Sequence, residues 1–90
     1  MIRYHILVSG RVQGVGFRYT ASHLASLYNL TGWVRNCYDG SVEMEVQGDP
    51  GNIDFFIQKL KTESRWIRIR SLEKKQIPLE SGETVFHVRY

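Results

Sequence analysis

The segment Gly10-Arg11-Val12-Gln13-Gly14-Val15-Gly16-Phe17-Arg18 separates two stretches of chain with different hydrophobic periods. This change of period predicts different secondary structure on the two sides of the segment. Residues 3–9 before it alternate apolar and polar side chains, as in a half-buried β-strand. Residues 17–29 after it repeat apolar side chains at helical spacing. Because glycines break regular structure and permit tight turns, the segment predicts a strand, a loop and a helix in that order.

The rest of the chain continues this alternation of strand and helix patterns. Asp39-Gly40 is a hairpin turn signal between two apolar stretches, and Asp49-Pro50 is a cap and first-turn signal for a second helix. We therefore predict strands at 31–37, 41–47, 66–77 and 84–90, and a second helix striped by Ile53, Phe56, Ile57 and Leu60.

The predicted element order is β-α-β-β-α-β with a further strand at the end. Because each strand alternates, the sheet should carry both helices on one face and meet water on the other. The order is typical of an α+β fold, the ferredoxin-like split β-α-β sandwich, with an antiparallel sheet whose core strands run 4-1-3-2. The last strand has no predicted place, and the chain of 90 residues predicts one domain over residues 1–90.

Composition limits the classes of protein that the chain can belong to. Hydrophobic residues make up 42% and charged residues 23%, which is ordinary for a soluble globular domain, and no apolar run is long enough to span a membrane. The start lacks the apolar core of a signal peptide, and the lone Cys37 cannot form an internal disulfide. We expect a cytoplasmic monomer with no membrane partner.

The glycine-rich loop contains groups that can bind an anion. Its backbone N–H groups, the start of the following helix and the planar guanidinium of Arg18 can converge on phosphate oxygens. Two familiar nucleotide motifs do not match: a lysine is missing for a Walker A loop, and Phe17-Arg18-Tyr19 follows Gly14-Val15-Gly16 where a third glycine is required. The alternative is a purely structural loop with Arg18 on the surface.

Topology adds a second polar side chain to this end of the sheet. The first two strands flank a crossover helix, so they run parallel and end at the same edge. Asn36 ends the second strand there, two strand spacings (roughly 10 Å) from the loop. Its carboxamide can both donate and accept, which suits a group that orients water. The alternative is an ordinary asparagine beside a turn.

Two separated motifs carry a family resemblance. The segment 10–18 closely resembles the signature loop of acylphosphatases, and Gly32-Trp33-Val34-Arg35-Asn36, with Asp39-Gly40-Ser41-Val42 and Gly48, resembles their second signature in order and spacing. Length and element order match as well. The resemblance implies hydrolysis of the carboxyl–phosphate bond of acyl phosphates, with inorganic phosphate as a product and with no metal and no other cofactor.

The resemblance also implies roles for particular residues. Arg18 and Asn36 would be the catalytic residues: Arg18 would bind the phosphoryl group and Asn36 would position the attacking water. The backbone amides that would share the phosphoryl group belong to Gln13, Gly14, Val15, Gly16 and Phe17.

Two functions from other classes remain as alternatives. An RNA-binding module shares this element order, but Glu43 and Glu45 on the exposed side of their strand would repel a phosphate backbone, so we expect no nucleic acid partner. A catalytically silent anion-binding module is the second alternative. It is disfavoured because both key side chains are present and because the chain stops at one domain, unlike larger maturation proteins with such a domain.

Overall fold

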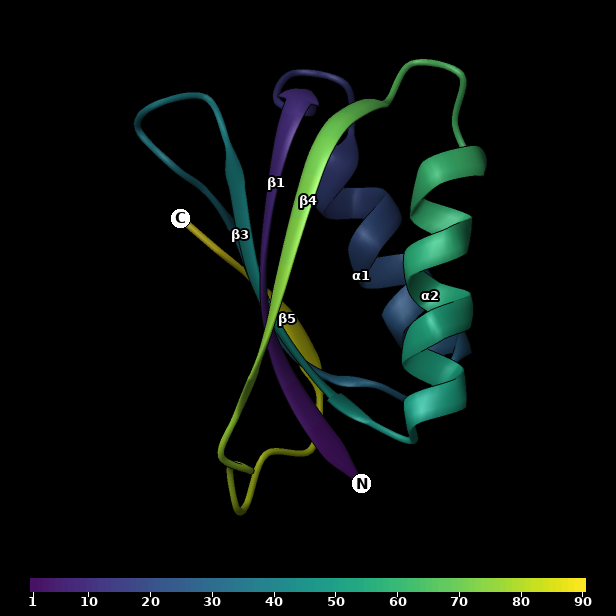
Figure 1. Cartoon of the computed structure of the whole chain (residues 1–90), viewed down its shortest axis with the longest axis vertical. Coiled ribbons are helices and arrows are strands. Elements are labelled where there is room, and N and C mark those ends of the chain that lie inside the picture. The colour runs from purple at the N-terminus through teal and green to yellow at the C-terminus, as the bar shows by residue number, and fades with distance from the viewer.

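The computed structural model describes residues 1–90 as a five-stranded sheet with two helices packed on one of its faces (Figure 1). The elements are β1 (Ile2–Arg11), α1 (Phe17–Leu27), β2 (Thr31–Asn36), β3 (Val42–Gly48), α2 (Pro50–Thr62), β4 (Arg68–Ile77) and β5 (Phe86–Arg89). This order confirms the predicted α+β, ferredoxin-like fold. Neither helix is both long and apolar enough to cross a membrane.

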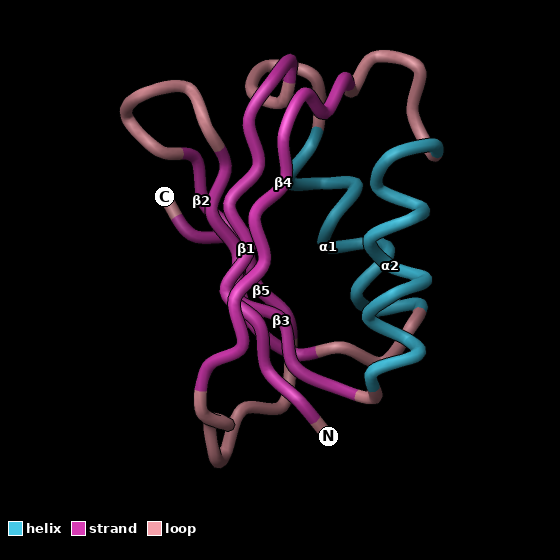
Figure 2. The backbone as a smooth tube through the Cα atoms, viewed as in Figure 1, coloured by secondary structure: helices cyan, strands magenta, loops and turns pink.

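The strands lie in the order β4-β1-β3-β2-β5. The first four pair antiparallel in the predicted 4-1-3-2 order, but β5 pairs parallel with β2, so the sheet is mixed rather than antiparallel throughout. The cause is the connection over residues 78–85, which crosses one end of the sheet to its far edge (Figure 2). A strand that begins at that end must run in the same direction as β2.

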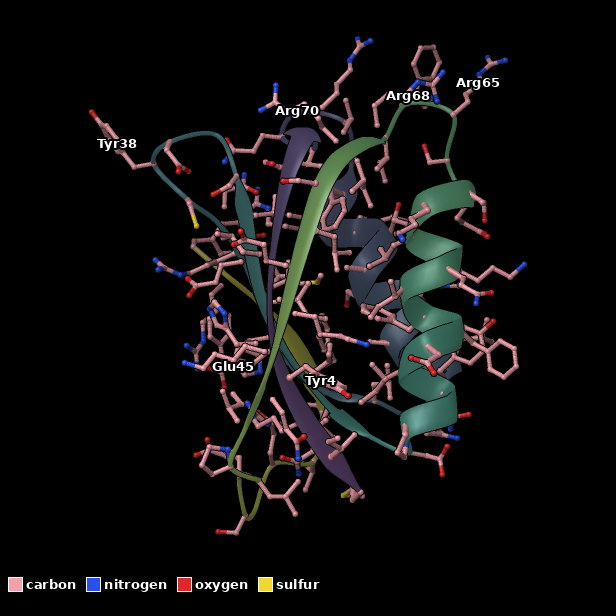
Figure 3. The ribbon with its side chains drawn as sticks, viewed as in Figure 1. Tyr4, Tyr38, Glu45, Arg65, Arg68 and Arg70 are labelled. Carbon is pink, nitrogen blue, oxygen red and sulfur yellow. The ribbon has the colours of Figure 1, made fainter.

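The core lies between the sheet and the helices. Ile6, Val8 and Met44 point inward from β1 and β3 and are fully buried, as alternation predicts. The helices close the core with apolar stripes that include Leu24 and Phe56. In Figure 3, Tyr4 points toward the helices and Glu45 toward the open face of the same sheet. The packed core therefore fixes the positions of the strand ends.

The open face of the sheet carries a buried ion cluster instead of a purely hydrated surface. The guanidinium of Arg3, only 1% exposed, lies 2.9 Å from a carboxylate oxygen of Glu45 and 2.8 Å from one of Glu83. Burial works against a charged Glu83, but hydrogen bonds from Arg3 and Thr31 and the charge of Arg3 lower the pKa of this carboxyl. Since Glu83 belongs to the connection before β5, the cluster helps to hold the last strand in place.

Candidate active site

The loop between β1 and α1 is a tight turn over residues 13–16 that follows the buried Val12. Gly14 and Gly16 have φ angles of 73° and 78°, in the left-handed region that side-chain-bearing residues rarely adopt. A Cβ atom on either glycine would meet no atom within 4 Å. The backbone conformation, and not crowding, is therefore what requires glycine at both positions.

The loop and the start of α1 present unpaired backbone donors. Gly16 occupies the N-cap position, so no side chain caps the helix, and the first turn contains no acidic residue. The N–H groups of residues 13–16 donate no hydrogen bond of standard geometry within the protein. Unpaired N–H groups and the positive end of the helix dipole together favour a bound anion at this point.

Arg18 lies in the first turn of α1 and is half-buried. Its guanidinium carbon lies 4.8 Å from the centre of the Tyr90 ring, and it forms no ion pair with a carboxylate. Stacking uses the face of the guanidinium and leaves its N–H edges available. Tyr90 therefore stabilises the cation of Arg18 and leaves its hydrogen-bond donors unused.

Asn36 ends β2 at the same end of the sheet as the loop. It pairs with Val42 of β3, and β3 separates β2 from β1, as the topology predicts. The side chain is half-buried, and its carboxamide is hydrogen-bonded to no other group of the protein. The amide is thus free to hold a small polar molecule.

One cavity of about 350 Å³ brings the predicted residues together. Five of its lining residues are among the predicted site residues, namely Gly14, Gly16, Phe17, Arg18 and Asn36. The other lining residues are Val12, Tyr19, Ser22, Val88 and Tyr90. The cavity therefore unites the glycine loop, the first turns of α1, the end of β2 and the end of the chain.

Gln13 and Val15 do not line this cavity. The side chain of Val15 packs against the hydrophobic core, whereas that of Gln13 turns toward the β2–β3 connection. There its amide nitrogen lies 2.7 Å from the carbonyl oxygen of Cys37 and 2.8 Å from that of Ser41. Phosphate binding by the backbone amides of residues 13–17 stays a prediction.

The hairpin loop over residues 37–41 pairs several of its polar groups with one another. The Asp39 carboxylate accepts hydrogen bonds from the backbone N–H and the hydroxyl of Ser41, at 3.0 and 2.6 Å. These bonds lower the pKa of Asp39. The N–H of Cys37 donates to the carbonyl of Ser41 at 2.8 Å. Figure 3 shows Tyr38 at the tip of this loop, pointing into solvent.

Comparison with known protein families shows which family the chain belongs to. The acylphosphatase family model matches residues 4–88, which is nearly the whole chain. The chain belongs to the acylphosphatase family. The acylphosphatase of Clostridium acetobutylicum is 42% identical over 90 residues, which are 100% of this chain and 99% of that protein.

Solved structures of the acylphosphatase family have the same fold. The crystal structure of acylphosphatase from Bacillus subtilis superposes with a TM-score of 0.93 at 34% identity, over 100% of both chains. The crystal structure of T. kodakarensis HypF superposes with a TM-score of 0.88 at 37% identity, over 100% of this chain but only 12% of HypF. The fold thus occurs both as a whole chain, in the acylphosphatase from Bacillus subtilis, and as part of a much longer one, in HypF.

Sequence reasoning missed two contributions to this site. One is Tyr90, whose ring lies against Arg18; nothing in the sequence could place it, because β5 itself had no predicted position. The other is the side chain of Gln13, whose hydrogen bonds depend on the path of the hairpin loop. No three His, Cys, Asp or Glu side chains gather in the structure as metal ligands would.

Proposed function

We propose that this member of the acylphosphatase family hydrolyses the carboxyl–phosphate bond of acyl phosphates by direct attack of a positioned water. The observation that carries the proposal is the single cavity that joins the glycine loop and Arg18 with Asn36. It combines donors for a phosphoryl group with a free carboxamide for a water molecule.

The phosphoryl group of the substrate occupies the loop. Its charge is spread over three oxygens, and the unpaired N–H groups of residues 13–17 meet these oxygens from one side. The N–H edges of Arg18 meet them in pairs, with the guanidinium held flat against Tyr90. These donors are in place before the substrate arrives, so little reorganisation accompanies the reaction.

Asn36 holds the attacking water by its carboxamide. An oxygen of the water forms a bond to phosphorus while the bond from phosphorus to the acyl oxygen breaks, and the carboxylate leaves with the bonding electrons. The proton of the water passes to the substrate itself. Because the leaving carboxylate is already a stable anion, no strong general acid is needed, and the enzyme contributes mainly alignment and charge stabilisation.

Several further properties belong to the same proposal. The protein works as a cytoplasmic monomer of one domain over residues 1–90, without a metal ion, a cofactor, a nucleic acid or a membrane. The monomer is proposed because one chain supplies both side chains that the reaction uses, Arg18 and Asn36. Sedimentation of the purified protein at micromolar concentration tests it, since a dimer would sediment measurably faster.

Hydrolysis of acetyl phosphate and benzoyl phosphate tests the proposed function. We expect turnover of both in excess EDTA, competitive inhibition by inorganic phosphate, and far slower turnover of an alkyl phosphate monoester, whose alkoxide leaves poorly without a general acid. In water enriched in oxygen-18, the label should appear in phosphate and not in the carboxylate.

Three outcomes would count against the proposal. Absence of turnover would refute the activity, and label in the carboxylate would show attack at the carbonyl carbon instead of phosphorus. A phosphorylated protein trapped by acid quenching would replace direct attack by water with a covalent intermediate.

A further inference from the structure

We propose that Gln13 is a positioning residue, whose side chain clamps the phosphate loop to the β2–β3 hairpin and so sets the separation between the loop and Asn36. This inference rests on the proposed function, because it concerns the alignment of the bound phosphoryl group with the attacking water. It assigns the side chain of Gln13 a task separate from phosphate binding.

Both amide donors of Gln13 are used at the hairpin. Its amide nitrogen has two hydrogens, and each has a carbonyl partner: Cys37 at 2.7 Å and Ser41 at 2.8 Å. Both lengths lie at the short end of the usual range for N–H···O bonds. A side chain with both donors engaged is held in one orientation, so its backbone is held with it.

The two carbonyls lie at the base of the hairpin loop. Cys37 directly follows Asn36 in the chain, and Ser41 directly precedes Val42, the residue that pairs with Asn36 across β2 and β3. The clamp therefore contacts both strands of the hairpin at the first residues on the loop side of the Asn36–Val42 pair. On the loop side, Gln13 directly precedes Gly14, which lines the cavity.

Few other hydrogen bonds connect the glycine loop with the end of β2 that carries Asn36. Asn36 itself has no hydrogen bond to the loop, and the hairpin loop pairs several of its polar groups with one another through Asp39 and Cys37. Water alignment depends on the distance between the loop and Asn36, and a displacement of about 1 Å in an active site can cost roughly a hundredfold in rate. A hydrogen-bonded link between the loop and the hairpin therefore serves catalysis, because it fixes this distance.

Gln13→Met tests the clamp, because methionine keeps the length and much of the volume of glutamine and removes both donors. Gln13→Glu is a second test, since the carboxylate places an acceptor against two carbonyl oxygens. Gln58→Met, at an exposed position of α2, is the matched control for the substitution itself. Each variant is made in the wild-type and the Asn36→Ala backgrounds.

We expect Gln13→Met to lower kcat about 10- to 100-fold, with Gln13→Glu at least as impaired. The inhibition constant of inorganic phosphate should change less than about threefold, since the loop donors and Arg18 remain. In the Asn36→Ala background, Gln13→Met should change the residual kcat less than about twofold, because the group that it aligns is gone. Gln58→Met should behave as wild type.

Three results would overturn the inference. Equal losses of kcat from Gln13→Met in both backgrounds would show that Gln13 acts independently of Asn36. A rise in the phosphate inhibition constant as large as the fall in kcat would make Gln13 part of the phosphate site. Unchanged kcat with lowered thermal stability would leave it a structural residue only.

A readout without turnover separates this inference from the proposed function. Gln13→Met should speed amide hydrogen exchange at Cys37, whose N–H donates to the carbonyl of Ser41 that Gln13 also contacts, while Gln58→Met should not. If wild type hydrolyses no acyl phosphate, the proposed function fails while faster exchange still shows the clamp. If exchange at Cys37 is unchanged, the clamp is refuted whatever the activity.

Discussion

Two loops leave the same end of the sheet, and they use their polar groups in opposite ways (Figure 1). The loop over residues 12–16 leaves its backbone N–H groups unpaired, and Arg18 follows with no acidic partner. The loop over residues 37–41 instead pairs the N–H groups of Cys37, Gly40 and Ser41 within itself. Each loop contains glycine with a positive φ angle, so a shared backbone conformation serves two purposes.

The difference indicates that the two loops have different roles in the site. Donors left unpaired in water lose little, but they gain a great deal when an anion with matching oxygens arrives. The hairpin beside the glycine loop is joined to it through Gln13, whose side chain donates to two hairpin carbonyls and so supports the loop. Substitutions in the two loops should therefore have different effects.

The largest effect is expected from Arg18→Lys. Lysine keeps the charge but lacks the planar edge that meets two phosphate oxygens and stacks on Tyr90. We expect kcat/KM for acetyl phosphate to fall about 10²–10³-fold, with loss of inhibition by inorganic phosphate. Arg70→Lys, at an exposed position of β4, is the control and should leave both quantities unchanged. Activity within threefold of wild type in Arg18→Lys would remove Arg18 from the site.

A matched pair of glycine substitutions compares the loops directly. Gly16→Ala and Gly40→Ala both place a side chain at a positive φ, 78° and 96°, with no atom within 4 Å of the new Cβ. Each should cost roughly 1–2 kcal/mol in the free energy of unfolding, measured by urea denaturation. Only Gly16→Ala should also weaken phosphate inhibition, by about tenfold or more, because it lies among the unpaired donors.

Equal losses of phosphate inhibition in both alanine variants would contradict the comparison. It would mean that the hairpin loop, and not only the glycine loop, contacts the phosphoryl group. Equal retention would mean that the conformation of Gly16 is dispensable for binding.

The smallest effect is expected from Asp39→Ala, and it should depend on pH. The hydrogen bonds from Ser41 lower the pKa of the folded carboxyl, so its stabilising contribution is present above the ordinary aspartate pKa and disappears as pH falls through the lowered folded value. Urea denaturation should show wild type more stable than Asp39→Ala at pH 7, with the difference shrinking toward about pH 2. kcat should stay within about twofold; a difference in stability that grows on acidification would contradict this assignment.

Half of the residues that line this site, with Arg18 and Asn36 among them, could be predicted from the sequence. The change of period around the glycine-rich segment predicts β1, the loop and α1, and the crossover rule then places Asn36 at the same edge as Arg18. These steps work because each depends on neighbouring residues or on a single topological constraint.

The remaining features depend on contacts between distant segments. The parallel place of β5 follows from the path of residues 78–85, which Arg3 and Glu83 help to fix, and no periodicity records that path. The stacking of Tyr90 on Arg18 follows from β5 in turn. The direction of the Gln13 side chain depends on carbonyl groups more than twenty residues away in the chain.

Steady-state kinetics of Asn36→Ala, with inorganic phosphate as the inhibitor, separate binding of phosphate from positioning of water. In the proposed function, phosphate binds in the half of the cavity around Arg18 and water is positioned in the half at Asn36. We predict that kcat for acetyl phosphate falls about 10²–10³-fold while the phosphate inhibition constant stays within about threefold of wild type. A kcat close to wild type, or an inhibition constant that rises as far as kcat falls, would contradict it.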